Sequence, residues 1–237
     1  MTSEAVPPKP VTDIWRPDLT RLPPLHPLRL VFRRFARLLA LLLIRLLTRT
    51  TFSGFDHLPR QLPALFAVNH LGDADTVVLL AGFPVGPEVL AKVEMWDFPV
   101  IGKLMDWYGM IWIHRGRPDR RALRSAEEAF AQGRSVVVAP EGRYSLAQGL
   151  ELGGHGAAYL AAKTRVPVIP IALTGTENRL VYGSLRHLRR PKIVVTMGEP
   201  VELGSGENDR EALAENTRRI MQALAALLPP DQRGAYR

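Results

Sequence analysis

Short apolar runs alternate with longer amphipathic stretches along most of this chain. The apolar runs are four to six residues long and end near turn-forming residues, which is typical of strands. They predict strands at residues 64–68, 88–93, 110–113, 135–139, 168–173 and 192–197. The stretches between and after them predict helices at residues 74–82, 98–108, 118–132, 156–164 and 209–228. This alternation predicts an α/β fold, in which a central mixed sheet is flanked by helices and functional residues lie on loops at strand ends.

Residues 28–50 have a different pattern, in which leucines and arginines are mixed without an interrupting Pro or Gly. Six apolar residues recur at spacings of four and three and form one stripe along the predicted helix: Leu28, Phe32, Phe35, Leu39, Leu42 and Leu46. The six arginines of the segment avoid this stripe. The arrangement predicts an amphipathic helix in a membrane interface, with its apolar face in the bilayer and its arginines at the lipid phosphates.

A bilayer-spanning helix is disfavoured for the same segment. Its three central arginines would each cost roughly 2.5–3.5 kcal/mol in the membrane interior, whereas each large apolar residue returns about 0.3–0.6 kcal/mol. A helix packed on the protein's own core is the alternative, and a DNA-binding helix is a weaker one. The membrane interpretation is favoured because residues 38–44 are apolar on every side of the helix.

The chain is predicted to have three parts. Residues 1–27 contain seven of the twenty prolines and little apolar periodicity, so we expect a disordered lead. This lead has none of the features of a secretory signal. The amphipathic helix at 28–50 follows, and the remaining residues, 51–237, are expected to form a single folded domain.

Composition narrows the possible chemistry. The chain has 46% hydrophobic and 23% charged residues, which is typical of a folded globular protein. The absence of cysteine excludes disulfides, thiolate metal sites and a cysteine nucleophile. Most of the net charge of +8 comes from residues 1–60, which have ten Lys and Arg against four acids. Such a basic segment points to nucleic acid or to an anionic membrane surface, and composition alone does not choose between them.

A histidine and an aspartate follow the first predicted strand. Asp75 is placed to hold one ring nitrogen of His70 so that the other can accept a proton, and Asp73 is a competing acid. No Gly-x-Ser-x-Gly elbow accompanies the pair, which therefore predicts direct transfer with His70 deprotonating a substrate hydroxyl. The other five histidines lack ligand spacing, so we expect surface or loop residues and no metal site.

Four segments together make this signal specific. They are Asn69-His70 with Asp75, Gly109-x-Ile111-x-Ile113-x-Arg115, Pro140-Glu141-Gly142, and Val166-Pro167 with Pro170. In that order they resemble the four motif blocks of the glycerolipid acyltransferase family, typified by bacterial 1-acyl-sn-glycerol-3-phosphate acyltransferase. The resemblance covers roughly residues 55–200.

The resemblance implies roles for the matching residues. His70 would be the catalytic base and Asp75 its orienting partner. Substrate binding would involve Lys92, Gly109, Arg115, Glu141, Gly142 and Arg143. Arg115 in particular would contact the phosphate of the acceptor. The departures lie in the acceptor half, since Arg143 comes one residue earlier than the family's arginine and Gly154-His155-Gly156 replaces its Lys-x-Gly.

The resemblance also implies an activity. A fatty acyl group would pass from acyl-CoA or acyl-carrier protein to a lysophospholipid hydroxyl, with 1-acyl-sn-glycerol 3-phosphate as acceptor and phosphatidic acid as product. Acylation of glycerol 3-phosphate, lysophosphatidylglycerol or a lyso-aminolipid is one alternative, and a catalytically silent lipid-binding protein is another. No cofactor is expected besides the acyl co-substrate. The expected partners are these substrates and a membrane surface, and no nucleic acid is expected to bind. The protein is expected to associate with the cytoplasmic face of the membrane.

Overall fold

A single seven-stranded sheet forms the centre of the protein. The computed structural model describes residues 8–58, 63–83, 86–116, 118–145, 149–204, 206 and 209–237. The strands are β1 (Arg49–Ser53), β2 (Leu65–Val68), β3 (Glu88–Lys92), β4 (Ile111–Ile113), β5 (Val136–Val138), β6 (Val168–Thr174) and β7 (Lys192–Met197). Their order is β1-β7-β6-β2-β5-β3-β4. Only β6 and β7 are antiparallel among these described neighbours, so the predicted mixed sheet is confirmed.

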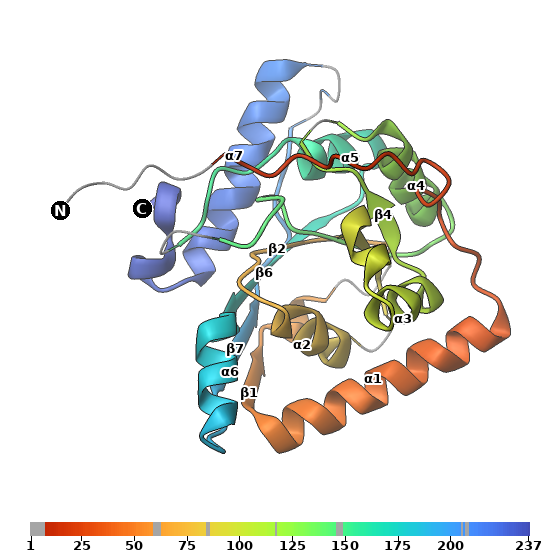
Figure 1. Cartoon of the computed structure of the whole chain (residues 1–237). Coiled ribbons are helices and arrows are strands. Elements are labelled where there is room, and N and C mark those ends of the chain that lie inside the picture. Colours follow the sequence, from red (N-terminus) through yellow and green to blue (C-terminus); the bar gives the residue numbers. More distant parts are fainter. Residues whose placement is uncertain are drawn as a thin grey trace.

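Helices cover both faces of the sheet (Figure 1). They are α1 (Pro27–Leu47), α2 (Ala74–Gly82), α3 (Ile101–Tyr108), α4 (Arg120–Ala131), α5 (Gly156–Thr164), α6 (Asn178–Arg186) and α7 (Arg210–Leu227). Short 3-10 segments lie at Phe55–His57, Val93–Asp97, Pro230–Gln232 and Gly234–Tyr236. Along β2, Leu65 and Ala67 pack with α4, α5 and α7, whereas Phe66 and Val68 pack with α1 and α2. The strand is therefore apolar throughout because both of its faces are buried.

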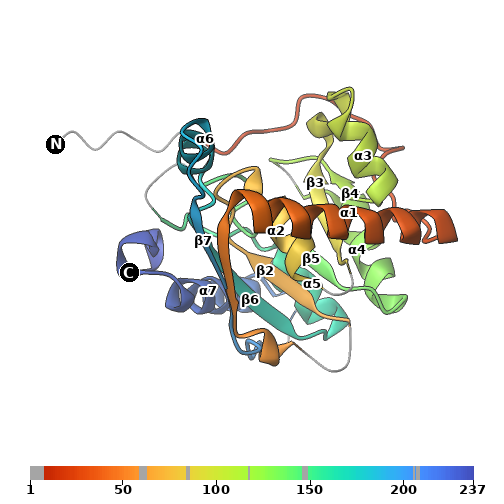
Figure 2. The same ribbon diagram turned by 90° about the horizontal axis from the view of Figure 1, so that it is seen from below.

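α1 packs on the domain with one face and exposes the other. It begins at Pro27 and ends at Leu47, so the predicted span of 28–50 is wrong at its end, where the chain enters β1. Ala40 and Ile44 are buried against the core that contains α2, and Figure 2 shows α1 crossing the face that carries α2. The α1 outer face consists of ten exposed residues: Leu28, Leu30, Val31, Phe35, Leu38, Leu39, Leu42, Leu43, Leu46 and Leu47. No helix within the described ranges is long and apolar enough to cross a membrane.

The arginines of α1 are not all directed outward as predicted. Arg33 is buried and forms a two-pronged ion pair with Glu88 of β3, with N–O distances of 3.0 and 2.6 Å. Arg29 and Arg37, one turn away on either side, donate to backbone carbonyls of the domain. The other three arginines of residues 28–50 are exposed. Half of the expected lipid-facing cations therefore hold the helix to its own protein.

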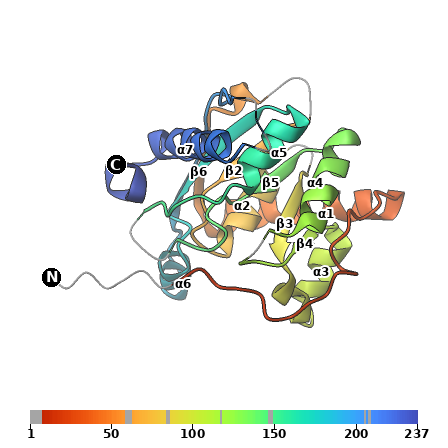
Figure 3. The same cartoon turned by 90° about the horizontal axis from the view of Figure 1, so that it is seen from above.

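Residues 8–26 are an extended segment packed across the domain, and the prediction of a disordered lead is wrong for them (Figure 3). The amide of Thr12 donates to the Arg115 carbonyl at 3.0 Å, and the amide of Arg16 donates to Nε2 of His114 at 3.0 Å. Leu19 is buried. The proline content could not reveal this order, because the segment's hydrogen-bond partners lie far along the chain, 98 residues away for Arg16 and His114.

Most predicted elements are present with the bounds shifted by no more than three residues, and β7, α2 and α5 have the predicted bounds. β1 and α6 were missed. In β1 four of the five residues are exposed, because it is an edge strand, so no apolar alternation marks it. α6 is only nine residues long, and Gly183 in its interior is a residue that weakens a helix prediction.

Candidate active site

The end of β2 is fixed to β6 by the residue before His70. The Asn69 side chain donates to the Leu173 carbonyl at 2.9 Å and accepts the Leu173 amide at 2.7 Å. Asn69 is itself buried. This two-bond contact sets the path of the chain as it leaves the sheet, and it therefore places His70 at the carboxyl edge of the strands. The sequence alone indicates no separate role for Asn69 beyond its place next to His70.

His70 and Asp75 are in direct contact. His70 Nδ1 lies 2.7 Å from Oδ2 of Asp75, a buried residue in the first turn of α2. The same Oδ2 accepts the amides of Leu71 and Gly72 at 2.7 and 3.1 Å. An oxygen that accepts from two amides is an acceptor for the ring as well, so Nδ1 carries the proton and Nε2 has a lone pair. Within the described residues Nε2 has no hydrogen-bond partner, and the His70 side chain is 30% exposed.

Glu141 is a fully buried acceptor that links the loop after β2, which carries His70, to the connection between β5 and α5. Its carboxylate accepts the His70 amide at 3.3 Å, the Ser145 hydroxyl at 2.8 Å and the Glu151 amide at 2.8 Å. Burial raises the pKa of Glu141, and these hydrogen bonds only partly offset the effect. The structure thus gives Glu141 a positioning role, and its predicted part in acceptor binding stays a prediction. Gly142 follows with a φ of 72°, a left-handed turn that favours glycine.

Tyr144 covers one side of His70, a contact that sequence analysis missed. The two rings lie 4.2 Å apart between centroids, and their planes meet at 66°. The hydroxyls of Tyr144 and Tyr182 donate to the Asp73 carboxylate at 2.6 and 2.9 Å. Partial burial raises the pKa of Asp73, but these hydrogen bonds outweigh burial and hold it below its usual value. Asp73 therefore anchors two tyrosines and does not compete for the His70 ring.

Arg143, which the resemblance assigns to substrate binding, is engaged by groups of the protein itself, and its predicted substrate contact stays a prediction. It is buried, its Nε donates to Glu151 at 2.7 Å, and its Nη1 donates to the Pro8 carbonyl at 3.0 Å. The ion pair lies within the connection between β5 and α5, and the contact with Pro8 fastens the N-terminal segment to that connection. Sequence spacing did not indicate the ion pair because the partner carboxylate, eight residues away, belongs to no recognisable motif.

Arg115 follows β4 and lies at the same edge of the sheet as His70. Its Nη2 donates to Glu94 at 3.3 Å, and its amide donates to the Thr12 hydroxyl at 2.8 Å. Its Nε is buried without a hydrogen-bond partner within the described ranges, and the side chain as a whole is 20% exposed. Lys92 ends the neighbouring strand β3 and is partly exposed. The acceptor contacts of both cations remain predictions.

Gly109 lies at the junction of α3 and β4, between the predicted helix at 98–108 and the predicted strand at 110–113. It ends α3 with a φ of 96°, and a Cβ at this position would lie 3.1 Å from Cδ of Arg29. Glycine is therefore needed for the turn and for the close approach of α1 to α3. Its expected role in substrate binding stays a prediction.

A second His–Asp pair has the same spacing as the first but no free nitrogen. His114 Nδ1 lies 2.7 Å from Oδ2 of Asp119, and His114 is a loop residue, as one of the two predicted placements has it, but a buried one, 2% exposed. Its Nε2 accepts the Arg16 amide, and the Trp15 ring lies 4.5 Å away. Both ring nitrogens are thus used structurally. Among the described residues no group of three or more histidines and acids is placed to hold a metal ion.

Comparison of the chain with known proteins identifies the family to which it belongs. Residues 49–174, which include β1 to β6, match the family model described as Acyltransferase. A chloroplastic 1-acyl-sn-glycerol-3-phosphate acyltransferase of Brassica napus is 30% identical over 187 residues, which cover 74% of this chain and 54% of the relative. A probable enzyme of the same name from Mycoplasma pneumoniae is 24% identical over 219 residues, covering 86% of this chain and 82% of the relative. The chain spans about half the length of the plant and algal relatives it matches.

The fold is also similar to that of a solved structure. The crystal structure of the 1-acyl-sn-glycerophosphate acyltransferase from Thermotoga maritima aligns with a TM-score of 0.60 at 21% identity. The alignment covers 83% of this chain and 76% of that protein. The sheet and its helices therefore have the same overall arrangement in the two molecules.

Proposed function

This chain belongs to the acyltransferase family, and from that premise we propose that it is an O-acyltransferase of membrane lipids. It transfers a fatty acyl group from acyl-CoA or acyl-carrier protein to the free hydroxyl of a lysophospholipid. The acceptor we propose is 1-acyl-sn-glycerol 3-phosphate, which gives phosphatidic acid.

The His70–Asp75 contact at 2.7 Å, with Nε2 lacking a partner within the described residues, carries this proposal. Nε2 removes the proton of the acceptor hydroxyl as that oxygen attacks the thioester carbonyl carbon. Asp75 stabilises the imidazolium that forms. The tetrahedral intermediate then breaks its carbon–sulfur bond, and the imidazolium returns the proton to the departing thiolate. This route uses no enzyme nucleophile, in keeping with a chain that has neither cysteine nor a Gly-x-Ser-x-Gly elbow.

Arg115 supports a phosphate-bearing acceptor. A guanidinium binds phosphate oxygens through several N–H groups at once, and the Arg115 side chain is partly exposed at the sheet edge that carries His70. The relatives from Brassica napus and Mycoplasma pneumoniae are named for 1-acyl-sn-glycerol 3-phosphate. These two observations favour the same acceptor.

A second acceptor class is favoured by the groups nearest His70. Arg143 is engaged by Glu151, whereas the exposed carboxylate of Asp73 is bound to the tyrosine that covers the His70 ring. A carboxylate at this position attracts a cation, so the amino group of a lyso-aminolipid is the competing headgroup.

The α1 outer face supports action at a membrane surface. Ten large apolar side chains are exposed along one helix. Single exposed apolar residues are common on protein surfaces, but a contiguous group of this size is typical of an interaction site. A helix of this kind inserts its apolar face at the level of the lipid headgroups. We expect α1 to hold the protein at the cytoplasmic face of a membrane, where a product with two acyl chains is retained.

Lipid mass spectrometry of the purified protein tests the proposal. The protein is incubated with acyl-CoA or acyl-carrier protein and with a panel of lyso-acceptors, and His70→Ala is the matched control. We expect phosphatidic acid from 1-acyl-sn-glycerol 3-phosphate. Acylation of a lyso-aminolipid alone would establish the second acceptor, and no acyl transfer by a folded wild-type protein would refute the activity.

A further inference from the structure

α3 and the residues before it expose a second group of large apolar side chains. Phe98, Val100, Ile101, Leu104 and Trp107 are each at least half exposed, with Val100 at 68% and Trp107 at 64%. We call these five residues the α3 face. Single exposed apolar residues are normal on a protein surface, but five within ten positions are typical of an interaction site.

The α3 face is continuous with α1. The Trp107 ring packs edge-on against Phe32 of α1 with 5.6 Å between centroids. Arg29 of α1 donates to the carbonyls of Asp106 and Trp107 at the end of α3. The two helices are therefore fixed side by side, and the apolar surface of one extends that of the other.

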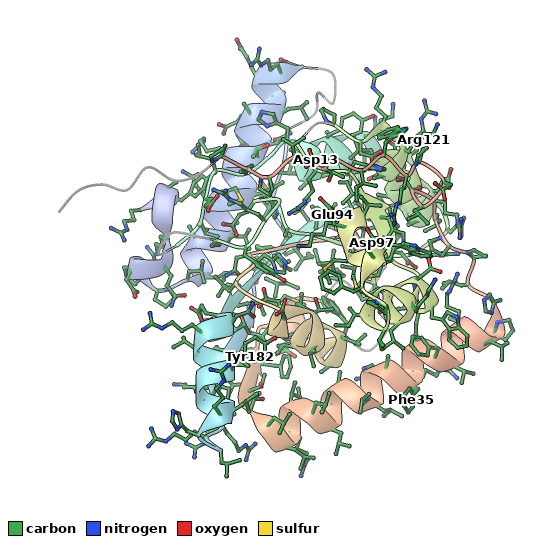
Figure 4. All side chains as sticks on the ribbon, viewed as in Figure 1. Asp13, Phe35, Glu94, Asp97, Arg121 and Tyr182 are labelled. Carbon is green, nitrogen blue, oxygen red and sulfur yellow. The ribbon has the colours of Figure 1, made fainter. Side chains whose placement is uncertain are left out.

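The position of α3 relates this surface to the active site. In Figures 1 and 2, α2 lies between α6 and α3, and α1 runs along the same side of the molecule. Figure 4 shows Phe35 on the outer side of α1 and Tyr182 on α6. The first turn of α2 holds Asp75, and Tyr182 is linked to the site through Asp73. The exposed apolar surfaces of α1 and α3 therefore lie next to α2, whose first turn holds Asp75 of the His70–Asp75 pair.

We propose that the α3 face is a second membrane contact, which together with the α1 outer face brings the His70 end of α2 to the lipid surface. The inference rests on the proposed function, since only a lipid acceptor needs this placement. It extends that function because α3 would help to bind the enzyme to the bilayer. An acceptor with a single acyl chain could then reach His70 without leaving the membrane.

The charge distribution favours a lipid surface over an acidic carrier protein. On α3 itself the charged residues are Lys103 and Asp106, and Lys103 lies over the Trp96 ring. With one positive and one negative side chain, α3 has no basic patch that would bind an acidic protein. Its surface is instead compatible with insertion of apolar side chains into a bilayer. Cations are instead placed further along the same surface: residues 178–198 contain five Lys and Arg and no acid. Arg190 donates to the Arg45 and Thr48 carbonyls and so holds this basic segment beside the end of α1.

Polar substitution of exposed α3 residues tests the proposal without disturbing the core. In Val100→Ser/Leu104→Gln, Ser is placed at the N-cap of α3, which has no side-chain cap now, and Gln favours helix. The full chain is titrated with vesicles of phosphatidylcholine and phosphatidylglycerol in equal parts. We expect this variant to bind at least about tenfold more weakly than wild type with an unchanged melting temperature. Leu152→Gln, at a similarly exposed leucine outside the helices, is the control and should bind like wild type.

Fluorescence quenching gives an independent measurement. Brominated lipids quench only tryptophans that approach the acyl chains, so vesicle binding should quench wild type strongly and Trp107→Phe much less. Wild-type vesicle affinity of the α3 variant, or equal quenching of Trp107→Phe, would overturn the proposal.

The same titrations separate the inference from the function on which it rests. If Phe35→Gln/Leu42→Gln on α1 releases the protein and the α3 variant does not, α1 docks alone and the inference fails while the acyltransferase proposal stands. If the α3 variant keeps its vesicle affinity and loses only turnover with acyl-carrier protein, the α3 face binds that protein and the inference is wrong. Acyl transfer to a short-chain acceptor in solution reports on the function itself and should be unchanged in the α3 variant.

Discussion

Asp75→Asn tests how the catalytic pair works, because the geometry constrains where the amide can go. In the wild-type chain, Oδ2 accepts His70 Nδ1 and the amides of Leu71 and Gly72. Asparagine must place its oxygen there, since an NH₂ group cannot accept two backbone donors. The His70 Nδ1 proton therefore keeps its acceptor, so the tautomer survives and only the negative charge of Asp75 is lost.

The expected loss of rate follows from that charge. Two unit charges about 4 Å apart interact by about 4 kcal/mol at an effective dielectric constant of 20. His70 is partly exposed and has only part of its charge in the transition state, so about half of this energy, about 2 kcal/mol, is lost. This corresponds to a fall in kcat of about thirtyfold. His70→Ala removes the base itself and should lower kcat by about 10²–10⁴-fold.

Initial rates of acyl transfer to a short-chain acceptor, measured beside thermal unfolding, distinguish the outcomes. Oδ1 of Asp75 is buried without a partner in the described residues, so an NH₂ group in its place should lower the free energy of unfolding by about 1–3 kcal/mol. If Asp75→Asn loses as much activity as His70→Ala, the tautomer has changed and the argument from the two amides is wrong. If folded His70→Ala retains a rate within about threefold of wild type, His70 is not the base.

Three further changes test other parts of the structure. Arg115→Ala should raise KM for a phosphate-bearing acceptor with little change in kcat, because its guanidinium is proposed to bind ground-state phosphate; an unchanged kcat/KM would exclude that contact. Arg33→Met leaves the fully buried carboxylate of Glu88 without its closest cation and should lower the free energy of unfolding by about 3–5 kcal/mol. Urea titration measures this loss, and a change below about 1 kcal/mol would contradict it. Glu141 has a raised pKa in the folded state, so its ionised form destabilises the protein and wild type regains stability as pH falls through that pKa. Glu141→Gln cannot titrate, so its melting temperature should fall further below that of wild type at pH 5 than at pH 7, and a constant difference would refute the assignment.

Local features of the sequence were sufficient to predict most of the helices and strands and the contact between His70 and Asp75. Strands buried on both faces, such as β2 and β6, are apolar runs wherever they lie in the sheet, so they can be recognised without their neighbours. His70 and Asp75 are five residues apart on one strand-to-helix turn, so their contact depends on few torsion angles. The exposed edge strand β1 has no such run, and α6 is short with a glycine in its interior, so both were missed.

The sequence by itself therefore determined the α/β class, the order of most elements and the His70–Asp75 pair, because each depends on residues close together in the chain. Only the tertiary structure decided which charged side chains are buried and paired with other groups of the protein. Arg33 meets Glu88 55 residues away, and Arg143 is held by Glu151 and by the carbonyl of Pro8, 135 residues away. The sequence shows that these cations exist but not which partner burial will bring to each. A charge removed from water must be paired, and the chain meets this requirement through long-range contacts that no local pattern specifies.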